Sequence, residues 1–88
     1  MAKVIVKLRV MPNDVNVNLE AVRKEICNIR IEDVEIKNTG VVPIAFGLKA
    51  ISVVALMPDK EGLCDKFVDK IKKIDGVQNV EVEAMDLL

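Results

Sequence analysis

Polar and apolar side chains alternate along the first segment of the chain, at residues 3–10. Because successive side chains of a β-strand point to opposite faces of a sheet, this alternation predicts a strand with one buried face. The apolar face carries Val4, Val6, Leu8 and Val10, and the opposite face carries Lys3, Ile5, Lys7 and Arg9. The basic residues of the second face are expected to meet Glu81 and Glu83 of the last strand in solvated cross-strand ion pairs.

Two segments have the apolar spacing of helices that bury one face. A helix is predicted at residues 19–29, with Asn18 as its N-cap. A second is predicted at residues 64–74, followed by Gly76 in the left-handed conformation that favours glycine. The expected inward residues are Leu19, Val22, Ile26 and Ile29 in the first helix, and Phe67, Val68, Ile71 and Ile74 in the second.

Three further segments are predicted to be strands. Residues 33–45 are interrupted near 38–40, where a bulge or bend is expected. Residues 48–57 are apolar on both faces, which is typical of a central strand. The last strand, at residues 77–85, alternates at Val80, Val82 and Ala84.

The two halves of the chain resemble each other, since Met11-Pro12 and Met57-Pro58 each end a strand before a helix. The order β-α-β-β-α-β predicts an α+β fold with the ferredoxin-like arrangement: a four-stranded antiparallel sheet with two helices on one face. Residues 1–88 are expected to form a single domain. Aligning the halves on Met-Pro predicts a helix-facing set of Ala50, Ser52, Val54 and Leu56. It leaves Lys49, Ile51, Val53 and Ala55 on the open face, with Ile5.

Composition excludes several classes of function. The net charge is −1, so no overall field attracts nucleic acid or an anionic membrane. The chain has no His, and Thr39 and Ser52 are its only hydroxyl side chains, which excludes a Ser–His or Cys–His nucleophile. Cys27 and Cys64 cannot alone form a zinc site and are expected to be small core or cap residues. No enzyme, metal or cofactor is therefore expected.

The absence of an apolar run of about 18 residues argues against a membrane span. The two distant cysteines suggest no disulfide framework. We therefore expect a cytoplasmic protein.

The segment PIAFGLKAISV, at residues 43–53, contains Phe46, one of only two Phe residues, directly before Gly47. By its position between two strands, Phe46 is either a residue that packs at a turn or an exposed aromatic contact, and composition does not separate these readings. The segment closely resembles the signature of the elongation factor 1-beta family, in particular its archaeal members. MPDKEGLCDKFVDKI and KIDGVQNVEV, later in the chain, resemble other parts of the same family.

The resemblance implies the same sandwich fold and a function in translation. The family is the guanine nucleotide exchange factor for elongation factor 1-alpha, the GTPase that carries aminoacyl-tRNA. In eukaryotic members the Phe of this block contacts the second domain of the GTPase, which implies that role for Phe46. The partner-binding residues implied here are Pro43, Ile44, Phe46, Gly47, Lys49, Leu87 and Leu88. The expected partner is elongation factor 1-alpha, with no direct nucleic acid or membrane binding and a monomer when free.

The chain departs from the family in two places. At the entry to the second helix Leu63-Cys64 replaces the family's Gly-Thr, so a good N-cap is missing there. The second departure is from the eukaryotic members, at the C-terminus. There a penultimate Lys reaches toward the magnesium and phosphate site, whereas Leu87 stands at that position here. Either another base, such as Lys49 or Lys3, replaces it, or exchange relies on displacement of the switch segments alone.

An alternative hypothesis is a ferredoxin-like regulatory module that binds a small molecule. Such a module would dimerise through its open sheet at Ile5, Ile51 and Val53.

Overall fold

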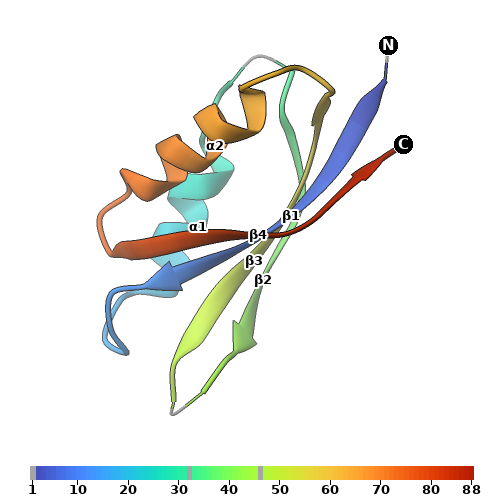
Figure 1. Ribbon diagram of the computed structural model, residues 1–88. Helices are drawn as coiled ribbons and strands as arrows, with labels where there is room; N and C mark the ends of the chain where they lie inside the picture. Colours follow the sequence, from blue (N-terminus) through green and yellow to red (C-terminus); the bar gives the residue numbers. More distant parts are fainter. Residues whose placement is uncertain (1, 32, 46) are drawn as a thin grey trace.

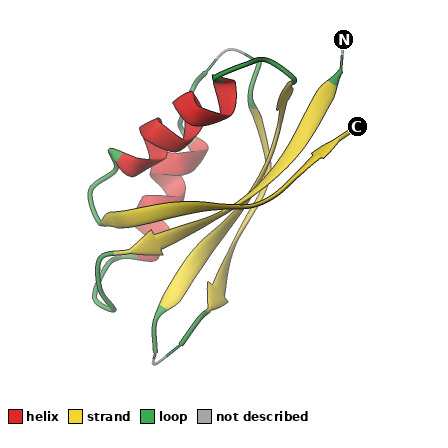
Figure 2. Ribbon diagram, in the orientation of Figure 1, coloured by secondary structure: helices red, strands yellow, loops and turns green. Residues whose placement is uncertain are grey.

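The computed structural model describes residues 2–31, 33–45 and 47–88. The elements follow the order β1 (Lys3–Pro12), α1 (Leu19–Cys27), β2 (Glu35–Pro43), β3 (Lys49–Pro58), α2 (Leu63–Lys72) and β4 (Val77–Leu87). The strands form one antiparallel sheet in the order β2-β3-β1-β4, and both helices cover the same face (Figures 1 and 2). This confirms the predicted ferredoxin-like sandwich. None of the described helices is long and apolar enough to cross a membrane.

The two helices begin differently. Asn18 caps α1 as predicted, because its side-chain oxygen accepts a hydrogen bond from the backbone N–H of Ala21 at 3.2 Å. Gly62 precedes α2 in a left-handed conformation and supplies no side-chain cap, as expected from the sequence. Both helices end two residues earlier than predicted. Ile29 and Ile74 lie in tighter turns, where each N–H bonds to the carbonyl three residues before it.

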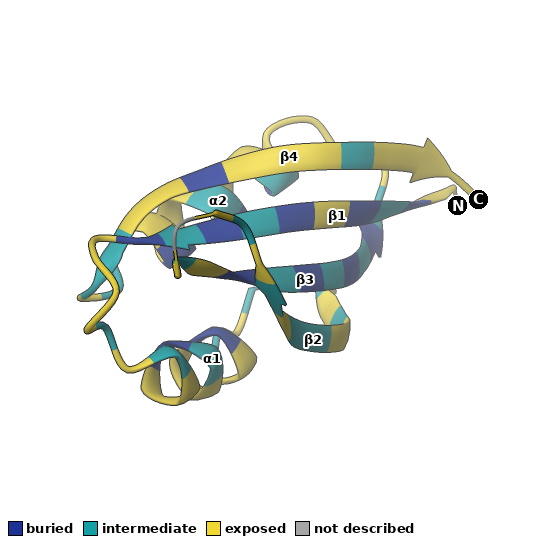
Figure 3. Ribbon diagram, turned by 90° about the horizontal axis from the view of Figure 1, so that it is seen from below, coloured by how far each residue is buried: buried dark blue, intermediate teal, exposed yellow. Residues whose placement is uncertain are grey.

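The core lies between the sheet and the helices. The predicted inward residues of β1 are buried, and Phe67 and Ile71 of α2 are completely enclosed. Leu63, which precedes the predicted start of α2, is also buried at 2% exposure. Figure 3 shows the buried positions recurring along β1 and β3. The residues of the described core are Val4, Val6, Leu8, Val10, Val22, Ile26, Ile51, Val53, Ala55, Met57, Leu63, Phe67, Ile71 and Val80.

The predicted facing of β3 is wrong. Val6 pairs with Ala55, and Leu8 pairs with Val53, so these residues share the face beneath the helices. Ala55 and Val53 are 0% exposed. The full set that faces the helices is Ile51, Val53, Ala55 and Met57, whereas Ser52, Val54 and Leu56 lie on the open face. Ala50 alternates with the second set but is completely buried. Aligning the halves on Met-Pro was one residue out of step, and a one-residue shift moves every side chain to the other face.

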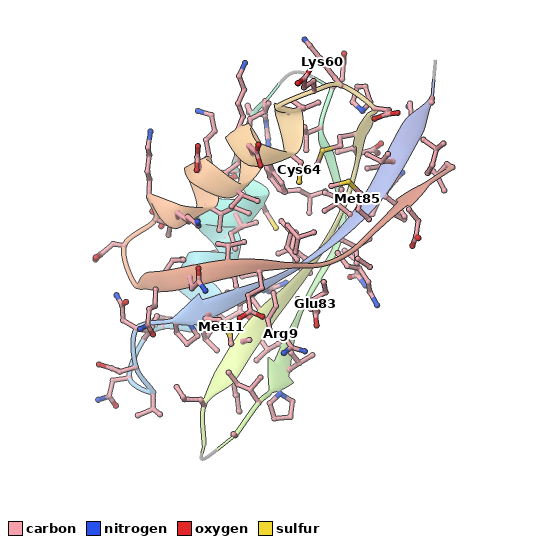
Figure 4. The ribbon with its side chains drawn as sticks, viewed as in Figure 1. Arg9, Met11, Lys60, Cys64, Glu83 and Met85 are labelled. Carbon is pink, nitrogen blue, oxygen red and sulfur yellow. The ribbon has the colours of Figure 1, made fainter. Side chains whose placement is uncertain are left out.

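Irregular pairing changes both edges of the sheet. In β2 the register shifts between Ile36 and Asn38, just before the stretch where a bulge was predicted. In β4 the pairing passes from Ala84 to Val82 with Glu83 left over as a bulge. The Glu83 carboxylate lies 2.8 Å from the Arg9 guanidinium, which confirms the expected ion pair between the basic and acidic strands (Figure 4).

The molecule is elongated along the strands. Its principal extents are 41 × 21 × 18 Å. The turn between β2 and β3 lies at one end of the long dimension, and the two chain termini lie together at the other (Figure 1). These two ends carry the residues singled out for partner binding.

Candidate functional site

The β2–β3 turn forms the first part of the candidate site. The strands end in the pair Pro43 and Lys49, and Pro43 has no N–H with which to extend the ladder. Two hydrogen bonds close the turn: Ile44 N–H donates to Leu48 O at 2.9 Å, and Leu48 N–H donates to Ala45 O at 2.8 Å. Gly47 has φ +80°, a conformation that a side chain would strain. The turn geometry therefore requires the glycine of the PIAFGLK segment.

Four of the predicted residues come together here. Pro43, Gly47 and Lys49 are exposed, and Ile44 is half-buried. Phe46, the central residue of the prediction, lies outside the described residues.

The turn has a neighbour that sequence reasoning missed. Gly47 and Lys49 line a pocket together with residues of the loop between β1 and α1, among them Asp14 and Val15. Val15 is 61% exposed. The available signal was an apolar residue between two polar ones in NDVNV, at residues 13–17.

Leu87 and Leu88 form the second part, at the opposite end of the sheet. Leu87 pairs with Val4, and the N–H of Leu88 donates to Lys3 O at 2.8 Å. Both leucine side chains are exposed, at 65% and 70%. Lys3 is thus the basic residue beside the leucines, whereas Lys49 lies at the turn end. The structure does not bring the six predicted residues that it describes into one cluster.

The bulge at Glu83 also changes which side chains of β4 face the helices. The sequence pattern placed Ala84 with Val80 and Val82, but Ala84 pairs with Lys7 on the open face. Met85 pairs with Val6 and takes the helix side instead. Met85 and Val82 are about half exposed there. An inserted residue reverses the alternation beyond it. The sequence pattern therefore could not predict which side chains in the later half of β4 face the helices.

The cysteines differ in environment. Cys27 ends α1 and is exposed, so the expectation of a core or cap residue is wrong for it. Cys64 packs against the core, and burial raises the pKa of its thiol, with a smaller contribution from Asp65. Thiolate formation at Cys64 is therefore disfavoured. Within residues 2–31, 33–45 and 47–88 no cluster of three potential metal ligands occurs.

One charge pair lies on α1. The hydrogen bond from Arg23 to Glu20, at 2.7 Å, lowers the pKa of the Glu20 carboxyl and raises that of the Arg23 guanidinium. Arg23 also donates to Thr39 Oγ1 at 3.4 Å, which links α1 to β2. These groups tie the helix layer to the sheet and offer no reactive centre.

Similarity to known proteins identifies the family. The family model described as the EF-1 guanine nucleotide exchange domain matches residues 5–88, nearly the whole chain. The chain belongs to this family. Elongation factor 1-beta of Archaeoglobus fulgidus is 52% identical over 88 residues, covering 100% of both chains. Elongation factor 1-beta of Staphylothermus marinus is 42% identical over 86 residues, covering 97% of this chain and 96% of the relative. The resemblance stated from residues 43–53 is thereby confirmed.

Solved structures of low sequence identity share the exchange domain's fold. The ACT domain from GTP pyrophosphokinase of Chlorobium tepidum has a TM-score of 0.62 at 18% identity, covering 89% of this chain and 95% of that one. The C-terminal domain of MgtC from Mycobacterium tuberculosis has a TM-score of 0.56 at 11% identity, covering 100% and 88%. These likenesses concern the fold alone.

The alternative hypothesis placed a dimer surface on the open sheet at Ile5, Ile51 and Val53, and this prediction is wrong. Ile51 and Val53 lie beneath the helices at 0% exposure, and only Ile5 of the three residues is on the open face. The open sheet therefore lacks the apolar set on which that hypothesis depended.

Proposed function

We propose that this protein is a guanine nucleotide exchange factor that promotes replacement of GDP by GTP on elongation factor 1-alpha during translation elongation. The observation that carries the proposal is the match of the exchange-domain family over residues 5–88. The chain acts as one exchange domain, a monomer when free, in the cytoplasm where translation takes place. It works by protein–protein binding, with no covalent step, no cofactor and no direct contact with nucleic acid.

Exchange follows from reciprocal binding energies. A factor that binds the nucleotide-free GTPase more tightly than the GDP-bound form must weaken GDP binding by the same ratio. GDP is held by phosphate-loop amides, a Lys and Mg²⁺, and these contacts are charge-assisted. Displacing the magnesium ion or the switch segments removes such contacts and speeds GDP release. Rebinding of GTP then releases the factor.

The elongated shape supports a contact at each end. In this proposal the β2–β3 turn, with Pro43, Ile44, Phe46, Gly47 and Lys49, binds the second domain of elongation factor 1-alpha. Leu87 and Leu88 approach the nucleotide-binding domain. The 41 Å length allows one molecule to reach both domains.

Lys3 is the basic residue that this arrangement brings near the nucleotide. Its backbone carbonyl accepts the hydrogen bond from Leu88, and its side chain is exposed. Lys49, at the turn end, contacts the other domain. The proposal therefore gives Lys3 the role of the ammonium group that Leu87 cannot supply.

Lys3→Ala is expected to lower the maximal exchange rate roughly tenfold, since hydrogen bonds to charged groups contribute about 1.5–3 kcal/mol. Lys49→Ala, in contrast, should raise the concentration needed for half-maximal exchange. Both are measured by titrating each variant against GDP-loaded elongation factor 1-alpha. Lys3→Arg should retain most of the rate. A normal maximal rate for Lys3→Ala would refute this role of Lys3 and indicate that exchange relies on displacement of the switch segments alone.

The function itself is tested with elongation factor 1-alpha from the same organism, loaded with a fluorescent GDP analogue. Excess GTP and Mg²⁺ are added, and release of the analogue is followed with and without this protein. Acceleration by substoichiometric protein is the expected result. No acceleration by the folded protein would refute the proposal, and circular dichroism verifies that the sample is folded.

A further inference from the structure

The loop between β1 and α1 presents an apolar side chain to solvent. Val15 is 61% exposed, and it stands between the polar residues Asp14 and Asn16. Among the described residues only Leu87 and Leu88, at the other end of the molecule, are large hydrophobic residues with greater exposure. A single exposed apolar residue is common on protein surfaces and does not by itself indicate a binding site. Whether Val15 belongs to one depends on the residues around it.

The loop is held in place on both sides of Val15. The backbone N–H of Asn13 donates to Gly76 O at 2.9 Å, and the N–H of Asn16 donates to Asp14 Oδ1 at 2.6 Å. The side chain of Val17 lies against Gly76, where an added Cβ would come within 3.0 Å of it. Val15 is therefore presented on an ordered turn, which reduces the entropy lost when a partner binds.

Val15 shares a pocket with the β2–β3 turn. The pocket has a volume of about 200 Å³, which is smaller than the roughly 300–1,000 Å³ of small-molecule sites. Its size suits a side chain of a protein partner. The lining residues are Pro12, Asp14, Val15, Val17, Leu19, Gly47 and Lys49. The loop and the turn thus form one continuous surface at this end of the molecule.

We infer that Val15 and this pocket belong to the surface that binds elongation factor 1-alpha, and that the pocket receives a side chain of the GTPase. This inference rests on the proposed function, which already assigns Gly47 and Lys49 to partner binding. Lys49 forms no ion pair within the described part of the chain, so its ammonium group is available to a carboxylate of the GTPase.

The test compares Val15→Ser with Val82→Ser. Val82 has a similar exposure, 48%, but lies in the middle of β4, outside both proposed contact regions. Binding to nucleotide-free elongation factor 1-alpha is measured by surface plasmon resonance. Val15→Ser is expected to raise the Kd about fivefold to tenfold, because it removes apolar area buried in the complex. Val82→Ser should stay within twofold of the unaltered protein.

A double-variant cycle tests whether Val15 and Lys49 act through the same pocket. Val15→Ser combined with Lys49→Ala should weaken binding by less than the product of the two single effects, since both residues contact one occupant. Val15→Ser combined with Leu87→Ala should give the full product, because these residues lie at opposite ends.

Three results would overturn the inference while the unaltered protein still accelerates GDP release: normal binding by Val15→Ser, equal weakening by Val82→Ser, or a fully multiplicative effect with Lys49→Ala. Loss of a dimer on Val15→Ser substitution, seen by sedimentation, would assign the surface to a second copy instead. If the unaltered protein does not accelerate GDP release, the proposed function fails and this inference with it.

Discussion

Replacing Phe67 by alanine is expected to lower the free energy of unfolding by about 3–5 kcal/mol. Among the described residues Phe67 is the largest completely buried side chain, and it lies on the inner face of α2 against the sheet. A domain of this length has a total stability of roughly 4–13 kcal/mol, so the substitution removes a large part of it. The chain has no Trp or Tyr, so urea unfolding is best followed by circular dichroism at 222 nm.

Two variants control for this prediction. Lys70→Ala changes an exposed position of the same helix and should stay within about 0.5 kcal/mol of the unaltered protein. Phe67→Leu leaves a smaller cavity, so its free energy of unfolding should lie between those of Phe67→Ala and Lys70→Ala. A change below about 1 kcal/mol for Phe67→Ala would contradict a core in which α2 packs through this ring.

The amphipathic elements could be predicted because their information is local. In β1 the apolar residues occur at every second position, and in α1 they occur at helical spacing, so each segment identifies its own buried face. Asn18 marks the start of α1 through its own chemistry. Gly76 has the predicted left-handed conformation, with φ +95°, but α2 ends before it, at Lys72. The order of these elements then leaves few ways to connect a sheet, which is why the fold followed from the sequence.

The facing of β3 could not be obtained in this way. Both faces of β3 are apolar, so Ile51 and Val54 are equally suited to the core by residue type. Pairing with β1 decides between them, because Val10 lies opposite Ile51 on the helix side. The bulge at Glu83 could not be predicted for the same reason, since it is defined only by the pairing of β4 with β1. Register is a property of two strands and is absent from either one alone.

The candidate site was predicted only in part for a related reason. The resemblance to the family named residues of the turn and of the C-terminus but gave no distance between them. The sheet places the turn and Leu87 at opposite ends, and it places Lys3 beside Leu88. Val15 carried only the weak signal of an apolar residue between two polar ones. Its place in the candidate site depends on a pocket shared with Gly47, which lies more than thirty residues away in the chain.

Phe46→Ala is expected to lower the second-order rate of nucleotide exchange by at least about tenfold, with a melting temperature close to that of the unaltered protein. The proposed function makes Phe46 the aromatic contact to the second domain of elongation factor 1-alpha. Truncation of an aromatic anchor in an interface often costs 2 kcal/mol or more. The measurement is the dependence of GDP release on the concentration of the variant. The loss should appear mainly in the concentration needed for half-maximal exchange, because the turn lies far from the end that approaches the nucleotide.

Controls at the same turn separate this role from a structural one. Ala45→Ser alters an exposed neighbour and should leave exchange unchanged. Phe46→Leu keeps much of the apolar area and should recover part of the rate. Unchanged exchange by Phe46→Ala would refute the contact role, even if the protein is an exchange factor. A fall in stability comparable to that of Phe67→Ala would make Phe46 a packing residue of the turn. The two readings that composition left open thus predict opposite results, because an interface contact changes binding and a packing residue changes unfolding.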